Sequence, residues 1–203
     1  MNDEQEARRV LDALPEVTEE RLRVLHDRLA DRADARGVLD VAYRTVDTPV
    51  GPLLLAATAK GLVRVAFSIE SHENVLTALA TQLSPRILRA PQRLDTAARE
   101  IDEYFAGRRR EFDLPLDFSL SKGFRLTVLR HLADIGYGHT ASYAAVAAAA
   151  GRPRAVRAVG TACAANPLPV VVACHRVVRS DGSSGGYRGG PAAKQALLAL
   201  EAA

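Results

Sequence analysis

The chain has 203 residues, of which 48% are hydrophobic and 25% are charged, a composition typical of a globular protein with a substantial core. No apolar run approaches the length of a membrane span, and the acidic start lacks the apolar core of a secretory leader. Two cysteines are too few for a disulfide scaffold or a four-cysteine zinc site. We therefore expect a cytoplasmic protein with no metal, no other cofactor and no membrane partner.

Charge is distributed unevenly along the chain. Residues 1–121 carry 17 Lys and Arg against 21 Asp and Glu, whereas residues 122–203 carry 10 against 3. The net charges of these two parts are therefore −4 and +7. A basic C-terminal part favours a polyanionic partner such as nucleic acid, although charge that serves only solubility would give the same numbers.

Residues 1–38 are expected to form a polar helical extension, built as a hairpin. Its apolar residues fall into two short stripes at helical spacing, one of Val10, Leu11 and Leu14 and the other of Leu22, Leu25 and Leu29. These stripes could pack on the main body or on a partner, and the extension carries no recognisable chemistry.

Residues 39–119 predict a small N-terminal α+β domain. Alternating and apolar runs separated by turn residues indicate an antiparallel meander of strands over 41–46, 53–58 and 62–67. Helical periodicity follows over 72–83 and 95–105, with a short strand over 86–89 between them. Residues 112–118 are expected to be extended, and Pro115 limits them to an edge or an irregular piece.

Residues 120–203 predict a mainly helical C-terminal domain. A helix begins after Ser121, and two short helices follow over 143–150 and 154–164, separated by Gly151-Arg152-Pro153. Two short helices joined by a glycine-containing turn in a basic region are typical of a DNA-binding helix-turn-helix.

The second of these helices is unusual for a helix that reads base sequence. Small residues, among them Ala155, Ala158 and Gly160, surround a single mid-helix cation, Arg157. Small side chains let a helix backbone approach a groove closely, and one long cation can then reach the stacked bases. This composition favours DNA binding without sequence preference, although the same residues could form core with Arg157 on the surface.

Cys174 follows an apolar run and precedes His175. Burial would raise the pKa of this thiol unless a base assists it. Neighbouring side chains in an extended chain point apart, so contact between Cys174 and His175 would need a local turn or a bridging water. Glu201 could orient His175, and Asn166 could pin the turn before the cysteine. A buried structural cysteine beside a surface histidine is the alternative.

These residues also carry a family resemblance. The chain resembles the O6-alkylguanine-DNA alkyltransferases, also called methylated-DNA–protein-cysteine methyltransferases, densely over about 122–201 and more loosely over 41–119. The matching motifs near the C-terminus are Asn166-Pro167, Cys174-His175-Arg176-Val177, Gly186-Tyr187, Gly189, Lys194, Leu197-Leu198 and Glu201. Upstream they are Thr48-Pro49-Val50-Gly51-Pro52-Leu53, Ser142-Tyr143 and Arg157-Ala158-Val159-Gly160.

The resemblance implies a ribonuclease-H-like N-terminal domain, a winged-helix-like C-terminal domain and direct DNA repair. Cys174 would accept the alkyl group of O6-alkylguanine, and by extension O4-alkylthymine, in double-stranded DNA after the base is flipped out through the minor groove. The transfer is irreversible, so each molecule reacts once. The protein is expected to be a monomer, and whether molecules cluster cooperatively on DNA is left open by the sequence.

The resemblance also assigns roles to individual residues. His175, held by Glu201, would activate Cys174 through a water, and Asn166 would order the turn. Tyr143 would press on the phosphate and contact the guanine, while Arg157 would fill the gap left by the base. Ala155, Ala158 and Gly160 would lie against DNA, and Val177, Tyr187 and Arg188 would line the base pocket.

One residue departs from the family pattern. Ala173 stands before the cysteine where the family has proline, so this turn should be less rigid. The rival functions are a nonenzymatic alkylated-DNA sensor, a helix-turn-helix regulator and a thiol hydrolase. The presence of Cys174 speaks against the sensor, because sensors of this fold replace the cysteine.

Overall fold

The computed structural model describes residues 18–202. Its N-terminal half is built on a four-stranded sheet of β1 (Val41–Val46), β2 (Leu53–Thr58), β3 (Gly61–Phe67) and β4 (Ile87–Arg89), in the order β3-β2-β1-β4. The first three strands form the antiparallel meander that the sequence predicts. The whole of β3 and nearly all of β2 are buried, because helices cover both faces of the sheet.

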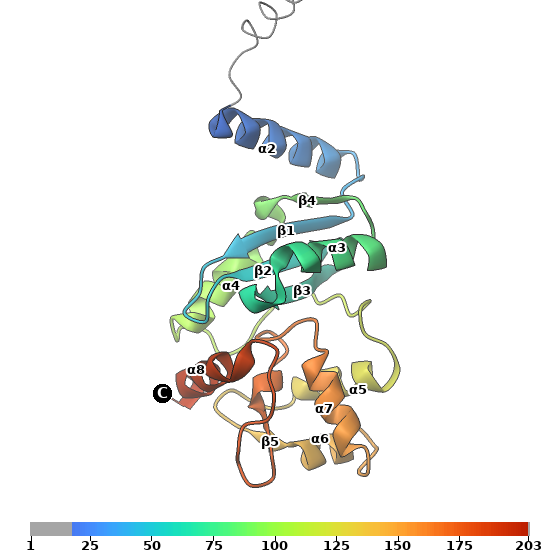
Figure 1. Ribbon diagram of the computed structural model, residues 1–203, viewed down its shortest axis with the longest axis vertical. Coiled ribbons are helices and arrows are strands. Elements are labelled where there is room, and N and C mark those ends of the chain that lie inside the picture. Colours follow the sequence, from blue (N-terminus) through green and yellow to red (C-terminus); the bar gives the residue numbers. More distant parts are fainter. Residues whose placement is uncertain (1–17, 203) are drawn as a thin grey trace, which may run out of the picture.

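Helix α3 (His72–Gln82) lies on one face of this sheet and α4 (Asp95–Phe105) on the other (Figure 1). Short 3₁₀ turns, η1 (Ser68–Glu70) and η2 (Pro91–Leu94), precede them. Val75 and Leu79 of α3 belong to a small hydrophobic cluster that is separate from the large core. The buried face of α4 belongs instead to the large core, which continues into the C-terminal half.

The sheet is mixed and not antiparallel throughout, because a fourth strand joins the predicted antiparallel meander in the parallel direction. Strand β4 pairs in parallel with β1, with Val41 opposite Ile87. The chain leaves β3 and passes through α3 before it enters β4, and such a helical crossover returns the chain in the parallel direction. Residues 112–118 form no strand and make a single isolated bridge, between Leu62 and Leu116.

The C-terminal half is mainly helical, as expected, so the mixed α+β fold is confirmed. It contains α5 (Gly123–Leu132), β5 (Ala141–Ser142), α6 (Tyr143–Ala149), α7 (Val156–Ala164), η3 (Cys174–Arg176), β6 (Val177–Val178) and α8 (Gly190–Ala202). The Ser142 side chain caps α6 by accepting a hydrogen bond from the Ala145 N–H, 3.0 Å away. Helix α7 begins at Val156, two residues later than predicted, so Ala155 lies at its N-cap.

Within the predicted N-terminal extension, α2 spans Glu19–Ala35 and lies beyond β4 at the far end of the molecule from α6 and α7 (Figure 1). Ala30 packs against the core, but the stripe of Leu22, Leu25 and Leu29 is more than half exposed. The other predicted stripe, Val10 to Leu14, lies outside the described residues. None of the described helices is long and apolar enough to cross a membrane.

Candidate active site

Cys174 begins the 3₁₀ turn η3, between a buried loop and the short strand β6. The turn closes through hydrogen bonds from the Cys174 N–H to the Val172 carbonyl, 2.7 Å, and from the Arg176 N–H to the Ala173 carbonyl, 3.0 Å. The sequence predicts that contact between Cys174 and His175 needs either a local turn or a bridging water, and a local turn is present. The loop before it includes Val170 at a φ of 74°, which is rare for a β-branched residue.

Asn166 holds this loop around the cysteine. Its Nδ2 donates to the Val172 carbonyl, 2.8 Å away, and to Cys174 Sγ at 3.1 Å, while its Oδ1 accepts from the Leu168 N–H. Burial raises the pKa of the Cys174 thiol to about 11, although the Asn166 hydrogen bond and the Lys194 charge oppose this rise. At neutral pH the thiol is therefore protonated, and a base is needed to release a thiolate.

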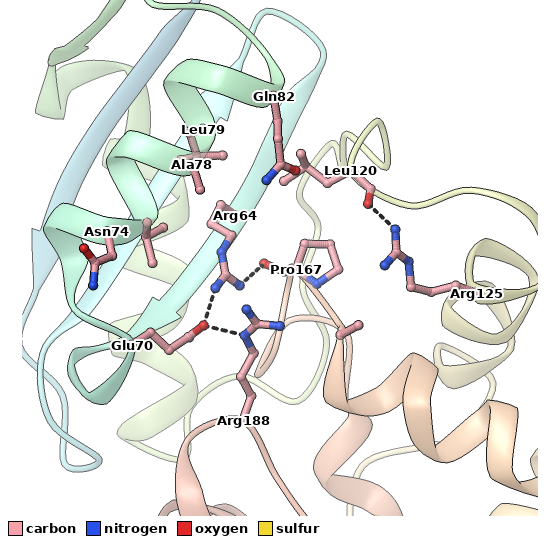
Figure 2. Close-up of a pocket in the computed structure, with 12 residues that line it drawn as sticks. Arg64, Glu70, Asn74, Ala78, Leu79, Gln82, Leu120, Arg125, Pro167 and Arg188 are labelled. Carbon is pink, nitrogen blue, oxygen red and sulfur yellow. Dashed lines mark hydrogen bonds and ion pairs between the residues drawn. The ribbon is translucent and has the colours of Figure 1, made fainter.

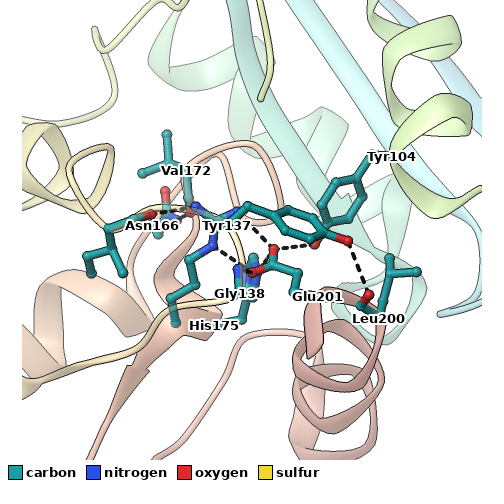
Figure 3. A network of polar contacts seen from close by, with 10 residues as sticks. Tyr104, Tyr137, Gly138, Asn166, Val172, His175, Leu200 and Glu201 are labelled. Carbon is teal, nitrogen blue, oxygen red and sulfur yellow. Dashed lines mark hydrogen bonds and ion pairs between the residues drawn. The ribbon is translucent and has the colours of Figure 1, made fainter. Parts of the chain in front are cut away.

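His175 is fully buried beside Glu201 of α8. Its Nε2 lies 2.8 Å from Glu201 Oε1 (Figure 3), and its buried Nδ1 has no hydrogen-bond partner among the described residues. Burial lowers the pKa of His175, an effect that Glu201 opposes, so the imidazole is neutral. With Nε2 donating to the carboxylate, Nδ1 is free to accept a proton.

Glu201 has further partners that the sequence did not reveal. Arg176 binds it in a bidentate manner, with Nε 2.8 Å from Oε2 and Nη2 2.9 Å from Oε1, and Tyr104 Oη donates to Oε1 at 2.7 Å. Burial raises the pKa of the Glu201 carboxyl, but the hydrogen bonds from His175, Arg176 and Tyr104 outweigh it and lower the pKa to about 2. The carboxylate is therefore ionised at all ordinary pH values.

The helix-turn-helix presents its second helix to solvent. Arg157 and Ala158 are exposed on α7, while Ala155 and Gly160 are partly buried. Tyr143, the first residue of α6, lies between α7 and the glycine-rich loop of residues 182–190. A Cβ on Gly185 would come within 2.2 Å of the Tyr143 hydroxyl, so only glycine allows the loop to approach this closely.

The glycine-rich loop places Tyr187 and Arg188 in different surroundings. Tyr187 lies edge-on to His175, with ring centroids 6.2 Å apart, and edge-on to Phe67 at 5.6 Å. The Arg188 guanidinium forms an ion pair with Glu70 of the N-terminal half, which also pairs with the buried Arg64 (Figure 2). Sequence patterns gave no sign of this pairing between the two halves of the chain.

Val177 is fully buried, and its carbonyl accepts a hydrogen bond from Lys194 Nζ at 2.6 Å. Lys194 is itself completely buried. Lys194 is the only basic residue of α8, and this was the only local signal for the contact. Among residues 18–202, no group of three or more His, Cys, Asp or Glu side chains could hold a metal ion.

Fold and site together define a protein that joins a helix-turn-helix to a buried cysteine in a network of hydrogen bonds. Two family models match the chain, namely the ribonuclease-like domain of 6-O-methylguanine DNA methyltransferase over 41–118 and its DNA-binding domain over 123–203. The methylated-DNA–protein-cysteine methyltransferase of Mycolicibacterium paratuberculosis is 40% identical over 161 residues, which cover 79% of this chain and 92% of the relative. The corresponding Methanosarcina barkeri protein is 35% identical, and the match covers 78% of this chain and 96% of the relative.

Solved structures agree with these matches. The O6-methylguanine methyltransferase of Mycobacterium tuberculosis superimposes with a TM-score of 0.71 at 38% identity, covering 80% of this chain and 93% of that one. A complex of the Mycobacterium tuberculosis protein with DNA superimposes with a TM-score of 0.68 at 36% identity, and the match covers 79% of this chain and 92% of that one. The chain belongs to the methylated-DNA–protein-cysteine methyltransferase family.

Proposed function

We propose that this protein repairs alkylated DNA by moving the alkyl group from O6 of guanine to Cys174. In this step the carbon–oxygen bond breaks as the sulfur–carbon bond forms, and the thiol proton leaves with the help of a base. The thioether is stable, so each molecule acts once. The observation that carries the proposal is the buried Cys174, which accepts a hydrogen bond from Asn166 and adjoins the His175–Glu201 pair.

His175 is the base in this proposal. Its Nδ1 accepts the Cys174 proton through a water, because Nε2 is committed to Glu201 and Nδ1 has no other partner among residues 18–202. The thiolate that forms is stabilised by the Asn166 Nδ2 donor and by the positive charge of Lys194. A hydrogen-bond donor to the leaving guanine would complete the step, and Tyr143 is our candidate.

DNA reaches this site through α7. O6 of guanine lies inside the duplex, so the base must be extruded before the thiol can reach it. The exposed Arg157 fills the space that the base leaves, and the small residues Ala155, Ala158 and Gly160 let α7 enter the minor groove. Tyr143, at the start of α6, presses on the adjoining phosphate. This binding is independent of sequence, as a lesion found in any sequence requires.

The extruded base lies against Val177, Tyr187 and the backbone of Arg188. The Tyr187 ring, held edge-on between Phe67 and His175, supplies an aromatic wall close to the cysteine. We extend the same pocket to O4-alkylthymine, whose alkylated oxygen occupies a comparable position. We further propose that the free protein is a monomer and that cooperative clustering, if it occurs, requires DNA. Sedimentation with and without DNA tests this point.

The decisive test is the mass of the protein after incubation with duplex DNA that contains O6-methylguanine. We expect a gain of one methyl group, located on the peptide that contains Cys174. Cys174→Ala should gain nothing, whereas Cys163→Ala, which removes the other buried thiol, should still be methylated. If the parent protein binds the DNA but gains no methyl group, the proposal is wrong and a nonenzymatic sensor is favoured.

A further inference from the structure

Tyr104 connects the N-terminal half of the chain to the candidate active site. It lies in the last turn of α4, is completely buried, and donates its hydroxyl hydrogen to Glu201 Oε1 at 2.7 Å. The two residues are 97 positions apart in the sequence. Figure 3 shows the Tyr104 side chain reaching Glu201 beside Tyr137 and Gly138.

We propose that Tyr104 is a positioning residue for the transfer reaction. From the N-terminal half, its hydroxyl holds Glu201 in place and keeps the neighbouring His175 neutral, so that His175 can accept the cysteine proton. This inference rests on the proposed function, in which His175 is the base. The N-terminal half, which bears none of the residues assigned to the chemistry, is then needed to complete the active site.

The negative charge on Glu201 is shared among several hydrogen-bond donors. Its Oε1 accepts hydrogen bonds from Tyr104, His175 and Arg176, and its Oε2 accepts from Arg176 and from the Gly138 N–H. Each donor withdraws negative charge from the carboxylate. Less charge is then available to attract a second proton onto the imidazole. Without the Tyr104 donor, the carboxylate would favour the protonated form of His175 more strongly.

The other groups around His175 either favour its neutral form, as Tyr104 does, or carry no charge. The positive charges of Arg176 and Lys194 lower the pKa of His175, as burial does. The protonated Cys174 thiol and the Tyr187 ring add no charge at neutral pH. Among residues 18–202, Glu201 is the only carboxylate that forms a hydrogen bond with the His175 ring, so the Tyr104 hydroxyl acts on His175 through the charge of Glu201.

The hydroxyl of Tyr104 is directed at Glu201 by the packing of its ring. Phe105 and Phe112 lie with ring centroids 5.3 Å away, and Tyr137 lies at 6.3 Å. Burial, with a contribution from Glu201, raises the pKa of Tyr104, so the hydroxyl remains a donor at every pH of interest. A buried ring held on several sides pays little entropy to keep this hydrogen bond.

Tyr104→Phe tests the proposal, because phenylalanine keeps the ring and removes only the donor. Tyr137→Phe is the matched control, since its hydroxyl belongs to the same aromatic cluster but donates to the Leu200 carbonyl at 3.1 Å. The rate of methyl transfer from O6-methylguanine duplex would be measured in single turnover between pH 5 and pH 9. Thermal unfolding and DNA affinity would be measured on the same preparations.

For Tyr104→Phe we expect the acidic side of the pH–rate profile to move to higher pH. The rate at pH 6 should fall about threefold or more relative to the rate at pH 8. Nitrogen-15 NMR of histidine-labelled protein should show His175 titrating at higher pH, without any need for activity. DNA affinity and the final yield of methylated Cys174 should be unchanged, and Tyr137→Phe should keep the parental profile.

The inference is wrong if the Tyr104→Phe profile and the His175 titration both coincide with those of the parent. If Tyr104→Phe loses thermal stability but keeps the parental pH–rate profile, the role of Tyr104 is purely structural and the proposal is likewise overturned. If the parent itself transfers no methyl group, the proposed function fails, and the NMR titration still decides whether Tyr104 acts on His175.

Discussion

The Nδ2 atom of Asn166 lies 3.1 Å from Cys174 Sγ and 2.8 Å from the Val172 carbonyl oxygen. One buried amide therefore serves two purposes. It holds the loop that leads into the cysteine, and it supplies a donor to the sulfur that will carry negative charge. Replacing Asn166 should consequently weaken the loop and remove the donor to the sulfur at the same time.

Asn166→Ala should lower both stability and rate. The Leu168 N–H and the Val172 carbonyl would lose their partner in a buried loop, which should cost about 2–4 kcal/mol of unfolding free energy. Methyl transfer should slow because the thiolate loses a donor. Urea unfolding and single-turnover rates measure the two effects. Asn74→Ala, on the exposed side of α3, should change neither, and an unaffected rate in Asn166→Ala would contradict the assigned contact with sulfur.

The Cys174 thiol should be unreactive toward simple alkylating agents. Burial raises its pKa to about 11 and that of Cys163 to about 12, from the ordinary thiol pKa of 9.0. At pH 8 iodoacetamide should modify Cys174 about 100-fold more slowly in the folded protein than in the denatured chain. Mass spectrometry of Cys163→Ala, which retains a single thiol, gives the rate directly. Rapid labelling of the folded protein would show that a base already deprotonates Cys174 without DNA.

The raised pKa values of the same two thiols predict how the stability of the folded protein depends on pH in the alkaline range. The unfolded chain releases these protons near pH 9, whereas the folded protein holds them until about 11 and 12. The unfolded state is therefore increasingly favoured as pH rises above 9, by up to about 1.4 kcal/mol per pH unit for each thiol. Urea midpoints between pH 8 and 10.5 measure this slope. In the double variant Cys163→Ala, Cys174→Ala the thiol contribution should disappear.

Ala173→Pro should be tolerated in this structure. The φ angle of Ala173 is −71°, within the range that proline imposes. Because proline restricts the unfolded chain, the substitution should stabilise the protein by about 0.4–1 kcal/mol and hold the cysteine turn more firmly. Unfolding curves and single-turnover rates would be compared with the parent. Unchanged stability and rate would mean that Ala173 does not loosen this turn.

Arg157→Ala should separate DNA handling from the chemistry. Arg157 is exposed on α7, away from the hydrogen-bond network around Cys174. Transfer from O6-methylguanine in duplex DNA should slow about tenfold or more, because extruding a base costs a few kcal/mol. Transfer from O6-benzylguanine supplied as a free base should keep the parental rate. Arg108→Ala, at an exposed ion pair in the N-terminal half, serves as the control and should be normal on both substrates.

Several features could be predicted from the sequence because their causes are local. Ser142 caps α6 where a serine precedes the apolar residues, and the antiparallel meander follows from short runs separated by turns. The helix pair α6 and α7 follows from periodicity and from the break at Gly151. The family resemblance rests on motifs that can be read in order along the chain, and the comparisons confirm it.

Other features could not be predicted from the sequence because they depend on residues that are far apart in the chain. The parallel pairing of β4 with β1 requires knowing where a crossover helix returns the chain. The guanidinium of Arg188, a residue expected to line the base pocket, pairs with Glu70, and that contact joins residues from the two halves. A tyrosine at the end of an amphipathic helix carries no local sign that its hydroxyl will reach a carboxylate 97 residues away.

The family, the mixed α+β class, the helix-turn-helix and Cys174 as the candidate nucleophile all follow from the sequence, since spacing and residue type suffice for each. Tertiary structure alone decided how that cysteine is held. It placed Asn166 against the sulfur, turned the chain at Cys174, and brought Tyr104 from the N-terminal half onto Glu201. Burial and hydrogen bonding set the protonation of a thiol, an imidazole and a carboxylate, and both are created only when residues far apart in the chain are brought together by folding.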